Sequence, residues 1–383
     1  MLQPSFSVPY TVAVSFVRDL WNVDQPLFAN LISRLEPGRQ HRLLVAVDDG
    51  LAAARSSLIA EIERYAAAYA SVLSLVCAPV LVPGGEASKN DLSHTLRLLD
   101  LINTHKIDRQ SFLVAVGGGA TLDTVSFAAA TGHRGIRTVR VPTTVLSQAD
   151  SGVAVKNGIN MFGKKNFVGT FAPAFAVIND VTMLDTLPLR DRIAGVSEII
   201  NVALLKDTVL FDQIETLAPR LARGDRDALD AVIRPSLEWH LAHICTTGDP
   251  FEQGSARPLD FGHWAAHKLE AITHHRVRHG EAVAIGMALD IRYAMLAGFL
   301  PDAVGQRILD VISAVGLPTW DEAVASRTSS GELALIAGLQ EFREHLGGTL
   351  HVTMLRGIQA PFEVTEMHPE LVEQAIRDLA PVH

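Results

Sequence analysis

The stretch Ser111-Phe-Leu-Val-Ala-Val-Gly-Gly-Gly-Ala-Thr-Leu-Asp123 decides the fold. It begins as a short, continuously apolar run rich in β-branched residues, which is typical of a strand buried on both faces of a parallel sheet. The run leads directly into Gly117, Gly118 and Gly119, and a helical pattern over 120–132 follows. We therefore predict a strand, a tight glycine turn and a helix, the repeating unit of an α/β fold.

The same alternation extends over the first half of the chain. Strands are predicted over 42–47, 75–82, 111–116 and 138–141, and helices over 51–70, 91–104 and 120–132. This order favours a parallel sheet covered by helices on both faces. From Leu189 onward long helical patterns follow one another, and Pro188 is suited to the start of a helix. We expect a Rossmann-like α/β domain over 1–188 and an α-helical domain over 189–383.

Composition limits the kind of partner. The 383 residues, 48% of them hydrophobic and 20% charged, are enough for two domains with substantial cores. The net charge of −9 argues against a nucleic-acid or anionic-membrane partner. The sequence shows neither an apolar run of about 18 residues nor a secretion-signal pattern, and Cys77 and Cys245 do not suggest a disulfide framework. We expect a cytoplasmic protein whose partner is a small molecule.

Three successive strand ends carry residues suited to a dinucleotide. The glycines at 117–119 allow the backbone to approach a diphosphate, whose charge is favoured by the amides at the next helix N-terminus. The segment Gly84-Gly-Glu-Ala-Ser-Lys89 forms a second loop at the same edge, and Asp48 is placed to accept a hydrogen bond from a ribose hydroxyl. A glycine-rich strand end is often only structural, so the prediction depends on the three ends together.

A dense polar segment follows between Pro142 and Asn166. It contains, in order, Pro142-Thr-Thr144, Asp150, Lys156, Asn160 and Gly163-Lys-Lys-Asn166. A solvated loop would explain one lysine but not this compact mixture. Lys156 and Lys165 are suited to neutralise phosphate, and Asp150 and Asn166 to hydrogen-bond substrate hydroxyls or to orient the lysines.

Histidines with metal-ligand spacing lie in the second half. His263 and His267 are four residues apart and share one face of a helix, and His279 lies a short helix and a turn further on. Such a pair alone is more often a packing feature than a metal site. Glu198 is able to complete the site, and with the glycine turn and the lysines the combination is typical of a metal- and nucleotide-dependent enzyme.

Taken in order and spacing, these motifs resemble the 3-dehydroquinate synthase superfamily, the sugar phosphate cyclases. The similarity covers most of the chain. It is carried by Gly117-Gly-Gly-Ala-Thr-Leu-Asp123, Arg134-Gly-Ile136, Pro142-Thr-Thr144, Asp150, Gly163-Lys-Lys-Asn166, Thr186-Leu-Pro-Leu-Arg190, Ser197-Glu198, Gly262-His-Trp-Ala-Ala-His267 and His279-Gly-Glu281. The resemblance implies a dehydroquinate synthase-like fold and a homodimer, with NAD+ held by the α/β domain.

The resemblance also implies a role for each matching residue. A Zn2+ or Co2+ ion would be bound by Glu198, His263 and His279. The implied cofactor contacts are Asp48, Glu86, Lys89, Gly117, Gly118, Gly119, Asp123, Thr143, Thr144, Lys156, Lys165 and Thr186. The implied catalytic and substrate positions are Asp150, Lys156, Lys165, Asn166, Asn201, Asp260, His267 and His345.

The resemblance implies a reaction in which NAD+ is recycled. Oxidation of one alcohol by NAD+ acidifies the adjacent C–H, so that phosphate leaves. The same NADH then restores the alcohol, the ring opens, and an intramolecular aldol addition closes a carbocycle. The metal would hold two substrate hydroxyls and lower their pKa.

Departures from the family pattern bear on the substrate. Where 3-dehydroquinate synthases typically read Glu-x-x-Lys, this chain reads Glu198-Ile-Ile-Asn201, and Leu-Asn-x-Gly-His becomes Leu259-Asp-Phe-Gly-His263. Three other cations of the family pattern also differ. An arginine is displaced to Arg257, a lysine has its nearest counterpart in His240, and a late lysine is replaced around His345. A buried carboxylate needs paired charge or strong donors, so 3-deoxy-arabino-heptulosonate 7-phosphate fits poorly. The neutral end of sedoheptulose 7-phosphate fits better.

Among cyclases of sedoheptulose 7-phosphate, the chain most resembles the 2-epi-valiolone synthases. The resemblance rests on Asp249-Pro-Phe-Glu252, the segment 257–270 and Lys156-Asn-Gly-Ile-Asn160. It predicts 2-epi-valiolone and phosphate as products, with 2-epi-5-epi-valiolone synthase or 3-dehydroquinate synthase as alternatives. An iron-type polyol-phosphate dehydrogenase is a more distant alternative with the same architecture. A non-catalytic NAD-binding relative is disfavoured because all three metal ligands are present.

Overall fold

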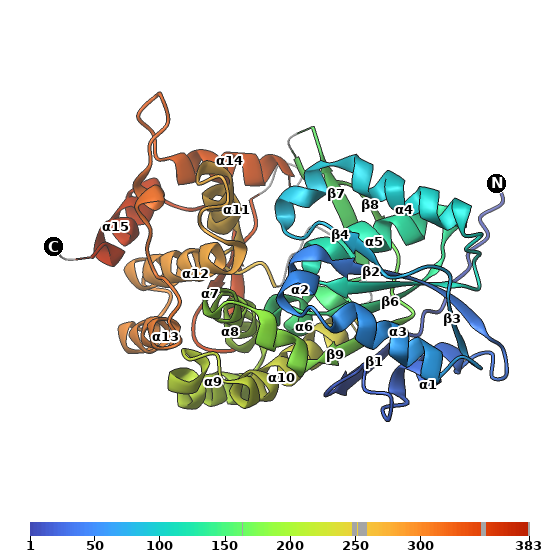
Figure 1. Ribbon diagram of the computed structural model, residues 1–383. Helices are drawn as coiled ribbons and strands as arrows, with labels where there is room; N and C mark the ends of the chain where they lie inside the picture. The colour runs from blue at the N-terminus through green and yellow to red at the C-terminus, as the bar shows by residue number, and fades with distance from the viewer. Residues whose placement is uncertain (163, 247–250, 252–258, 346–349, 382–383) are drawn as a thin grey trace. The chain divides into compact units, whose positions relative to one another are not determined.

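The computed structural model describes residues 1–162, 164–246, 251, 259–345 and 350–381. The chain divides into two compact units, Met1–Thr186 and Leu187–His383, whose helices and strands are drawn in Figure 1. Among the residues singled out from the sequence, Gly163, Asp249, Glu252 and Arg257 lie outside this description, as does the side chain of His345. None of the described helices is long and apolar enough to cross a membrane.

A parallel sheet forms the centre of the first unit. Its strands are, in spatial order, β1 (Ala13–Val17), β9 (Ala176–Asp180), β6 (Arg137–Pro142), β5 (Phe112–Gly117), β2 (His41–Asp48) and β3 (Leu73–Leu75), and β4 (Val80–Val82) also pairs with β2. All pairings in this sheet are parallel. The carboxyl ends of β2, β4, β5 and β6 therefore meet at one edge.

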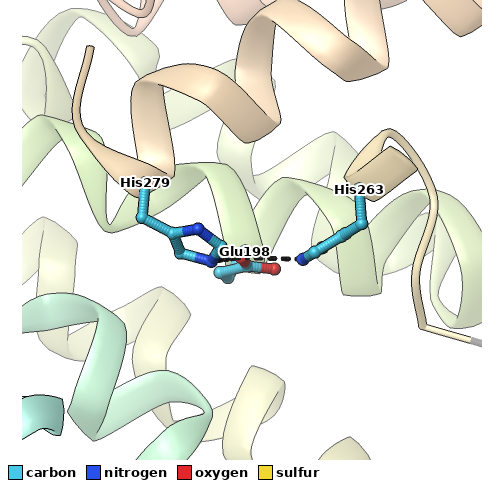
Figure 2. A group of neighbouring side chains, drawn as sticks. All are labelled: Glu198, His263 and His279. Atoms are coloured by element: carbon cyan, nitrogen blue, oxygen red, sulfur yellow. Dashed lines mark ion pairs between the residues drawn. The ribbon is translucent and has the colours of Figure 1, made fainter. Parts of the chain in front are cut away.

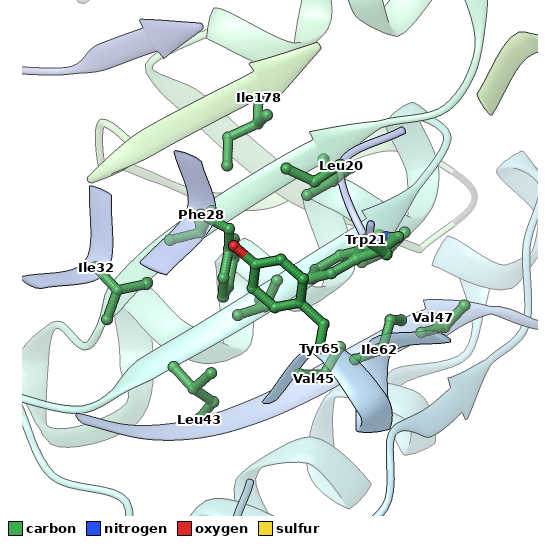
Figure 3. Packing of buried hydrophobic residues seen from close by; sticks show 14 of the residues in the cluster. Leu20, Trp21, Phe28, Ile32, Leu43, Val45, Val47, Ile62, Tyr65 and Ile178 are labelled. Carbon is green, nitrogen blue, oxygen red and sulfur yellow. The ribbon is translucent and has the colours of Figure 1, made fainter. Parts of the chain in front are cut away.

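Apolar cores lie on both faces of this sheet because the middle of β2 and nearly all of β5 consist of apolar residues. Leu43 and Val45 pack into one cluster, whereas the intervening Leu44 packs into another. Figure 3 shows the first cluster, in which Trp21 lies 5.7 Å from Tyr65 between ring centroids. The covering helices are α1 (Leu27–Ser33), α2 (Asp49–Ala54), α3 (Leu58–Ala68), α4 (Leu92–Thr104), α5 (Gly119–Thr131) and α6 (Val145–Ala149).

One helix and one strand that we predicted as continuous in this unit are each divided into two. The helix expected over 51–70 is broken at residues 55–57 into α2 and α3. The strand expected over 75–82 is two short strands, β3 and β4, because Pro79 lies between them and has no N–H for a ladder hydrogen bond. The polar segment after Pro142 is not a simple loop, because it includes the antiparallel hairpin of β7 (Lys156–Met161) and β8 (Lys164–Phe171).

The second unit is mainly helical, as predicted. Its helices are α7 (Leu189–Ala194), α8 (Val196–Lys206), α9 (Thr208–Leu221), α10 (Arg226–Thr246), α11 (His263–Ile272), α12 (His279–Leu296), α13 (Asp302–Ala314), α14 (Ala334–His345) and α15 (Pro369–Leu379). A small hairpin, β10 (Val352–Leu355) and β11 (Pro361–Val364), was not predicted. Helix α12 is buried along almost its whole length and packs against α8 and α11. These three helices carry the candidate metal ligands.

Candidate metal centre and strand-end loops

Three side chains from separate helices converge in the second unit. Glu198 lies in the first turn of α8, whereas His263 and His279 are the first residues of α11 and α12. One ligand atom from each lies within 4.8 Å of the others. The Nε2 atoms of His263 and His279 are each 3.4 Å from Glu198 Oε1. Figure 2 shows the three side chains pointing toward one another. The structure thus brings together the three residues predicted as metal ligands.

Both histidines are oriented by an acceptor on the far side of the ring. His263 Nδ1 lies 3.2 Å from the carbonyl oxygen of Phe261, and His279 Nδ1 lies 3.1 Å from Glu270 Oε2. Each Nδ1 faces an oxygen acceptor, so a proton on Nδ1 leaves Nε2, the nitrogen that faces Glu198, as the atom that would bind a metal. Two imidazole nitrogens and one carboxylate oxygen are a donor set that suits a divalent metal such as zinc.

The electrostatics of the cluster favour positive charge at this point. Burial by itself would raise the pKa of Glu198, but His263 and His279 outweigh it and hold that pKa below its usual range. Burial would likewise lower the pKa of His263, but the charge and hydrogen bond of Glu198 raise it, with a smaller contribution from Asp260. A bound cation supplies the same kind of compensation for the buried carboxylate.

The N-terminus of α12, which carries His279, is tightly held. Arg190 forms two hydrogen bonds to Glu281, of 2.5 and 2.7 Å, and Glu281 also accepts from the backbone N–H of Arg278 at 2.9 Å. A Cβ on Gly280 would lie 2.0 Å from the carbonyl oxygen of Ala194, so only glycine fits there. Arg190 and Glu281 belong to the motifs noted in the sequence, and the structure gives them this anchoring contact.

The remaining polar residues predicted in this unit lie around the same centre. Asn201 is buried, and its Nδ2 donates to the carbonyl oxygens of Leu259 and Phe261, both at 3.1 Å. His267 is exposed one turn after His263, and its ring stacks on that of His279 with centroids 6.4 Å apart. Asn201 therefore holds the loop before His263, whereas His267 borders the centre with an accessible ring.

In the first unit, Asp48 is fixed at the end of β2. Its carboxylate caps α2 by accepting from Leu51 N–H at 3.0 Å and also accepts from Thr121 Oγ1 at 2.8 Å. A Cβ on Gly84 would lie 2.3 Å from Asp48 Oδ2, and one on Gly117 would lie 2.7 Å from Thr121. These glycines therefore permit the close packing around Asp48, a structural reason that the sequence did not reveal.

The start of α5 fits a diphosphate. The helix begins at Gly119, and its N-cap Gly118 makes no side-chain capping hydrogen bond. No capping side chain occupies the first backbone N–H groups, which are the donors that helix N-termini offer to phosphate. Thr144 instead caps the neighbouring α6 by a capping box with Ser147, and Thr143 N–H donates to the carbonyl oxygen of Gly117 at 3.0 Å.

A buried lysine joins three further predicted residues. Lys89 Nζ lies 2.7 Å from Asp123 Oδ2, 2.5 Å from Asn166 Oδ1 and 3.6 Å from Glu86 Oε1, and its side chain is only 2% exposed. Burial raises the pKa of Asp123, although Lys89 opposes that rise. The cluster links the turn η1 (Glu86–Asn90) to α5 and β8. We call Glu86, Lys89, Asp123 and Asn166 the strand-end cluster.

The other predicted residues of the first unit lie near its polar segment or at its end. Asp150 ends α6, and Lys156 and Lys165 are exposed on the two strands of the β7–β8 hairpin. Thr186 is the last residue of the unit, and its Oγ1 donates to the carbonyl oxygen of Met183 at 2.9 Å.

Known proteins share both units. Family models described as 3-dehydroquinate synthase N-terminal and C-terminal match residues 79–194 and 195–333. A 2-epi-5-epi-valiolone synthase from Streptomyces glaucescens is 34% identical over 78% of this chain and 76% of its own. A 3-dehydroquinate synthase from Cereibacter sphaeroides is 34% identical over 82% of this chain and 84% of its own. The 2-epi-5-epi-valiolone synthase structure from Streptomyces hygroscopicus subsp. jinggangensis 5008, with NAD+ and Zn2+ bound, superposes with a TM-score of 0.86 at 27% identity over 99% of both chains.

The fold and the site together define a class of enzyme in which a parallel α/β unit is followed along the chain by a helical unit with a Glu–His–His centre. The chain belongs to the 3-dehydroquinate synthase-like sugar phosphate cyclases. The predicted fold class is confirmed.

Proposed function

We propose that this enzyme is a sedoheptulose 7-phosphate cyclase that forms a C7 cyclitol and releases phosphate. The observation that carries the proposal is the character of the polar groups beside His263. Asn201 is a neutral amide whose hydrogens are engaged by backbone carbonyls, and Asp260 adds negative charge. A substrate carboxylate there would meet like charge without a compensating cation from these positions, whereas a hydroxymethyl group would not.

The proposal assigns one cofactor to each unit. NAD+ is assigned to the strand ends of Met1–Thr186, and a zinc or cobalt ion to Glu198, His263 and His279. NAD+ supplies a hydride acceptor that is regenerated within the cycle, and the metal polarises substrate hydroxyls. The uncapped N-terminus of α5 and the paired Nδ1 atoms of both histidines support these assignments.

The remaining roles follow from charge and exposure. Lys156 and Lys165 are exposed cationic residues and are proposed to neutralise the substrate phosphate, with Asn166 as a further donor. His267 is accessible beside two metal ligands and is proposed to exchange a proton with a substrate hydroxyl. Lys89 is proposed to hold Asp123 in place beside the nicotinamide.

Two products of the same substrate are supported by different observations. The motifs that resemble those of 2-epi-valiolone synthases, among them Lys156-Asn-Gly-Ile-Asn160, favour 2-epi-valiolone as the product. The names of the Streptomyces relatives favour 2-epi-5-epi-valiolone as a second candidate. The two differ in the stereochemistry of ring closure.

The test is an assay of the purified protein with NAD+ and either Zn2+ or Co2+. Sedoheptulose 7-phosphate and 3-deoxy-arabino-heptulosonate 7-phosphate are supplied in separate reactions, and phosphate release, absorbance at 340 nm and the proton NMR spectrum of the product are recorded. We expect phosphate release from sedoheptulose 7-phosphate without accumulation of NADH, and the NMR spectrum distinguishes the two cyclitols. Turnover of only the deoxy-heptulosonate phosphate would refute the substrate assignment, and stoichiometric NADH would indicate a dehydrogenase.

A further inference from the structure

The loop that carries His263 is fastened from two sides. Asn201 of α8 binds its backbone carbonyls, as described above. On the other side, Asp290 of α12 accepts hydrogen bonds from Gly262 N–H at 3.1 Å and from Trp264 Nε1–H at 2.8 Å. These donors come from the residues immediately before and after His263. Each helix that supplies one of the other two ligands thus also supplies a side chain that holds this loop.

Asp290 is a carboxylate in an unfavourable environment. It is 0% exposed and lies in an otherwise apolar part of α12, about three turns from His279. Burying a carboxylate costs several kcal/mol unless hydrogen bonds compensate, and an apolar residue would pack there without that cost. What Asp290 provides, and an apolar residue could not, is therefore the pair of hydrogen bonds to the residues on either side of His263.

The backbone geometry shows how closely the loop is fitted to α12. Gly262 has a φ of +80°, which favours glycine, and a Cβ on it would lie 2.6 Å from Met287 N. A Cβ on Gly286 would lie 2.0 Å from the carbonyl oxygen of Gly262. The loop backbone rests directly on α12, and Asp290, one turn beyond Gly286, reaches both sides of His263.

We propose that Asp290, with its donor Trp264, is a positioning residue of the metal centre. It fixes the loop so that His263 Nε2 faces Glu198 and His279, and in this way it sets the metal affinity. The role differs from that of Glu270, which contacts a ligand ring directly. This inference rests on the proposed metal dependence.

The test uses the full-length protein with Zn2+ or Co2+ as the only added ligand. Trp264→Phe removes the indole donor and keeps an aromatic ring, and Asp290→Asn keeps the size of the side chain but loses its charge. Asp180→Asn in the first unit is the matched control, because Asp180 is equally buried and accepts from Leu20 N–H at 2.8 Å and Thr182 N–H at 2.9 Å. Zinc affinity is measured by competition with a chromophoric chelator, geometry by the visible absorption of the Co2+ form, and stability by thermal unfolding.

We expect Trp264→Phe and Asp290→Asn to weaken zinc binding by about 10- to 100-fold and to alter the Co2+ spectrum. Asp180→Asn should lose stability but keep the wild-type zinc affinity and spectrum. If Asp290→Asn does not fold, Trp264→Phe decides. Wild-type affinity and spectrum in the folded variants would make the pair merely structural and overturn the proposal. A wild-type protein that binds neither metal would overturn it together with the proposed metal dependence.

Discussion

The metal centre and the strand-end cluster hold their polar side chains in different ways. Glu198, His263 and His279 come from helices, and both histidines are oriented by acceptors within the same unit. The strand-end cluster lies on a short turn, a helix start and a hairpin, and the ammonium of Lys89 joins them. Loss of a metal ligand should therefore change metal binding and activity but leave the helices folded. Loss of Lys89 should also lower the stability of the elements that it joins.

The largest effect should come from removal of a metal ligand. We expect His263→Ala to lower phosphate release from sedoheptulose 7-phosphate by roughly 1,000-fold or more, since a catalytic metal contributes several kcal/mol of charge stabilisation. The helices should remain folded, because buried apolar residues pack them and His279 still faces Glu198. Activity, bound zinc and circular dichroism are measured together. His368→Ala, which removes an exposed histidine at the start of α15, is the control.

Retained activity and zinc content in His263→Ala would contradict the assignment of the ligand. Loss of the helical signal would instead contradict the local character of the metal centre, and with it the first half of the comparison.

A smaller effect on both binding and stability is expected for Lys89→Met. Asp123 and Asn166 lose their shared partner, so the free energy of unfolding should fall by about 2 kcal/mol, less than for a fully buried pair because Asp123 is partly exposed. NAD+ binding should weaken roughly tenfold, while zinc affinity stays unchanged. Calorimetric titration with NAD+, chelator competition and denaturant unfolding measure the three quantities. Lys164→Met, on the exposed side of β8, is the matched control.

Equal loss of zinc affinity in Lys89→Met would show that the two sites are not separable. Unchanged NAD+ affinity with reduced stability would leave Lys89 as a structural residue of the first unit.

The fold was largely predictable because its signals are local. Continuous apolar runs at β2 and β5 identify strands buried on both faces, and the glycine turn marks the start of α5. The hydrophobic pattern continues across residues 55–57 and across Pro79, so it predicted one helix and one strand where the structure has two helices and two strands. The edge strand β1 was missed because its pairing with β9, far along the chain, is a tertiary contact that no local pattern reveals.

The metal ligands were predictable, but the residues that orient them were not. Histidine spacing and Glu198 carry a chemical signature in the sequence. Glu270 and Asp290 act through contacts between helices, which depend on how α11 and α12 pack. One signal was available for Asp290, since a single acid in the otherwise apolar run from Ala282 to Ile291 demands a buried partner.

The smallest expected effect is a pH dependence of the stability of the first unit that comes from a histidine in its core. His41 lies at the start of β2, at the opposite end of that strand from Asp48, and is buried with its ring edge-on to Phe112 at 5.5 Å. Burial lowers the pKa of His41. The unfolded chain therefore binds this proton more readily, so the contribution of His41 to stability is present above the ordinary histidine pKa of about 6.5 and is lost as the pH falls below it.

We therefore expect wild-type protein to lose stability relative to His41→Phe as the pH is lowered, and the difference to be constant at higher pH. Denaturant unfolding of both proteins across this range measures the difference, and His368→Phe controls for loss of a histidine from the unfolded chain. A pH-dependent difference would assign part of the acid sensitivity to the core of the first unit, away from the strand-end cluster. A constant difference at every pH would mean that His41 binds its proton equally readily in the folded and unfolded states, and burial would then not be the cause of a lowered pKa at this histidine.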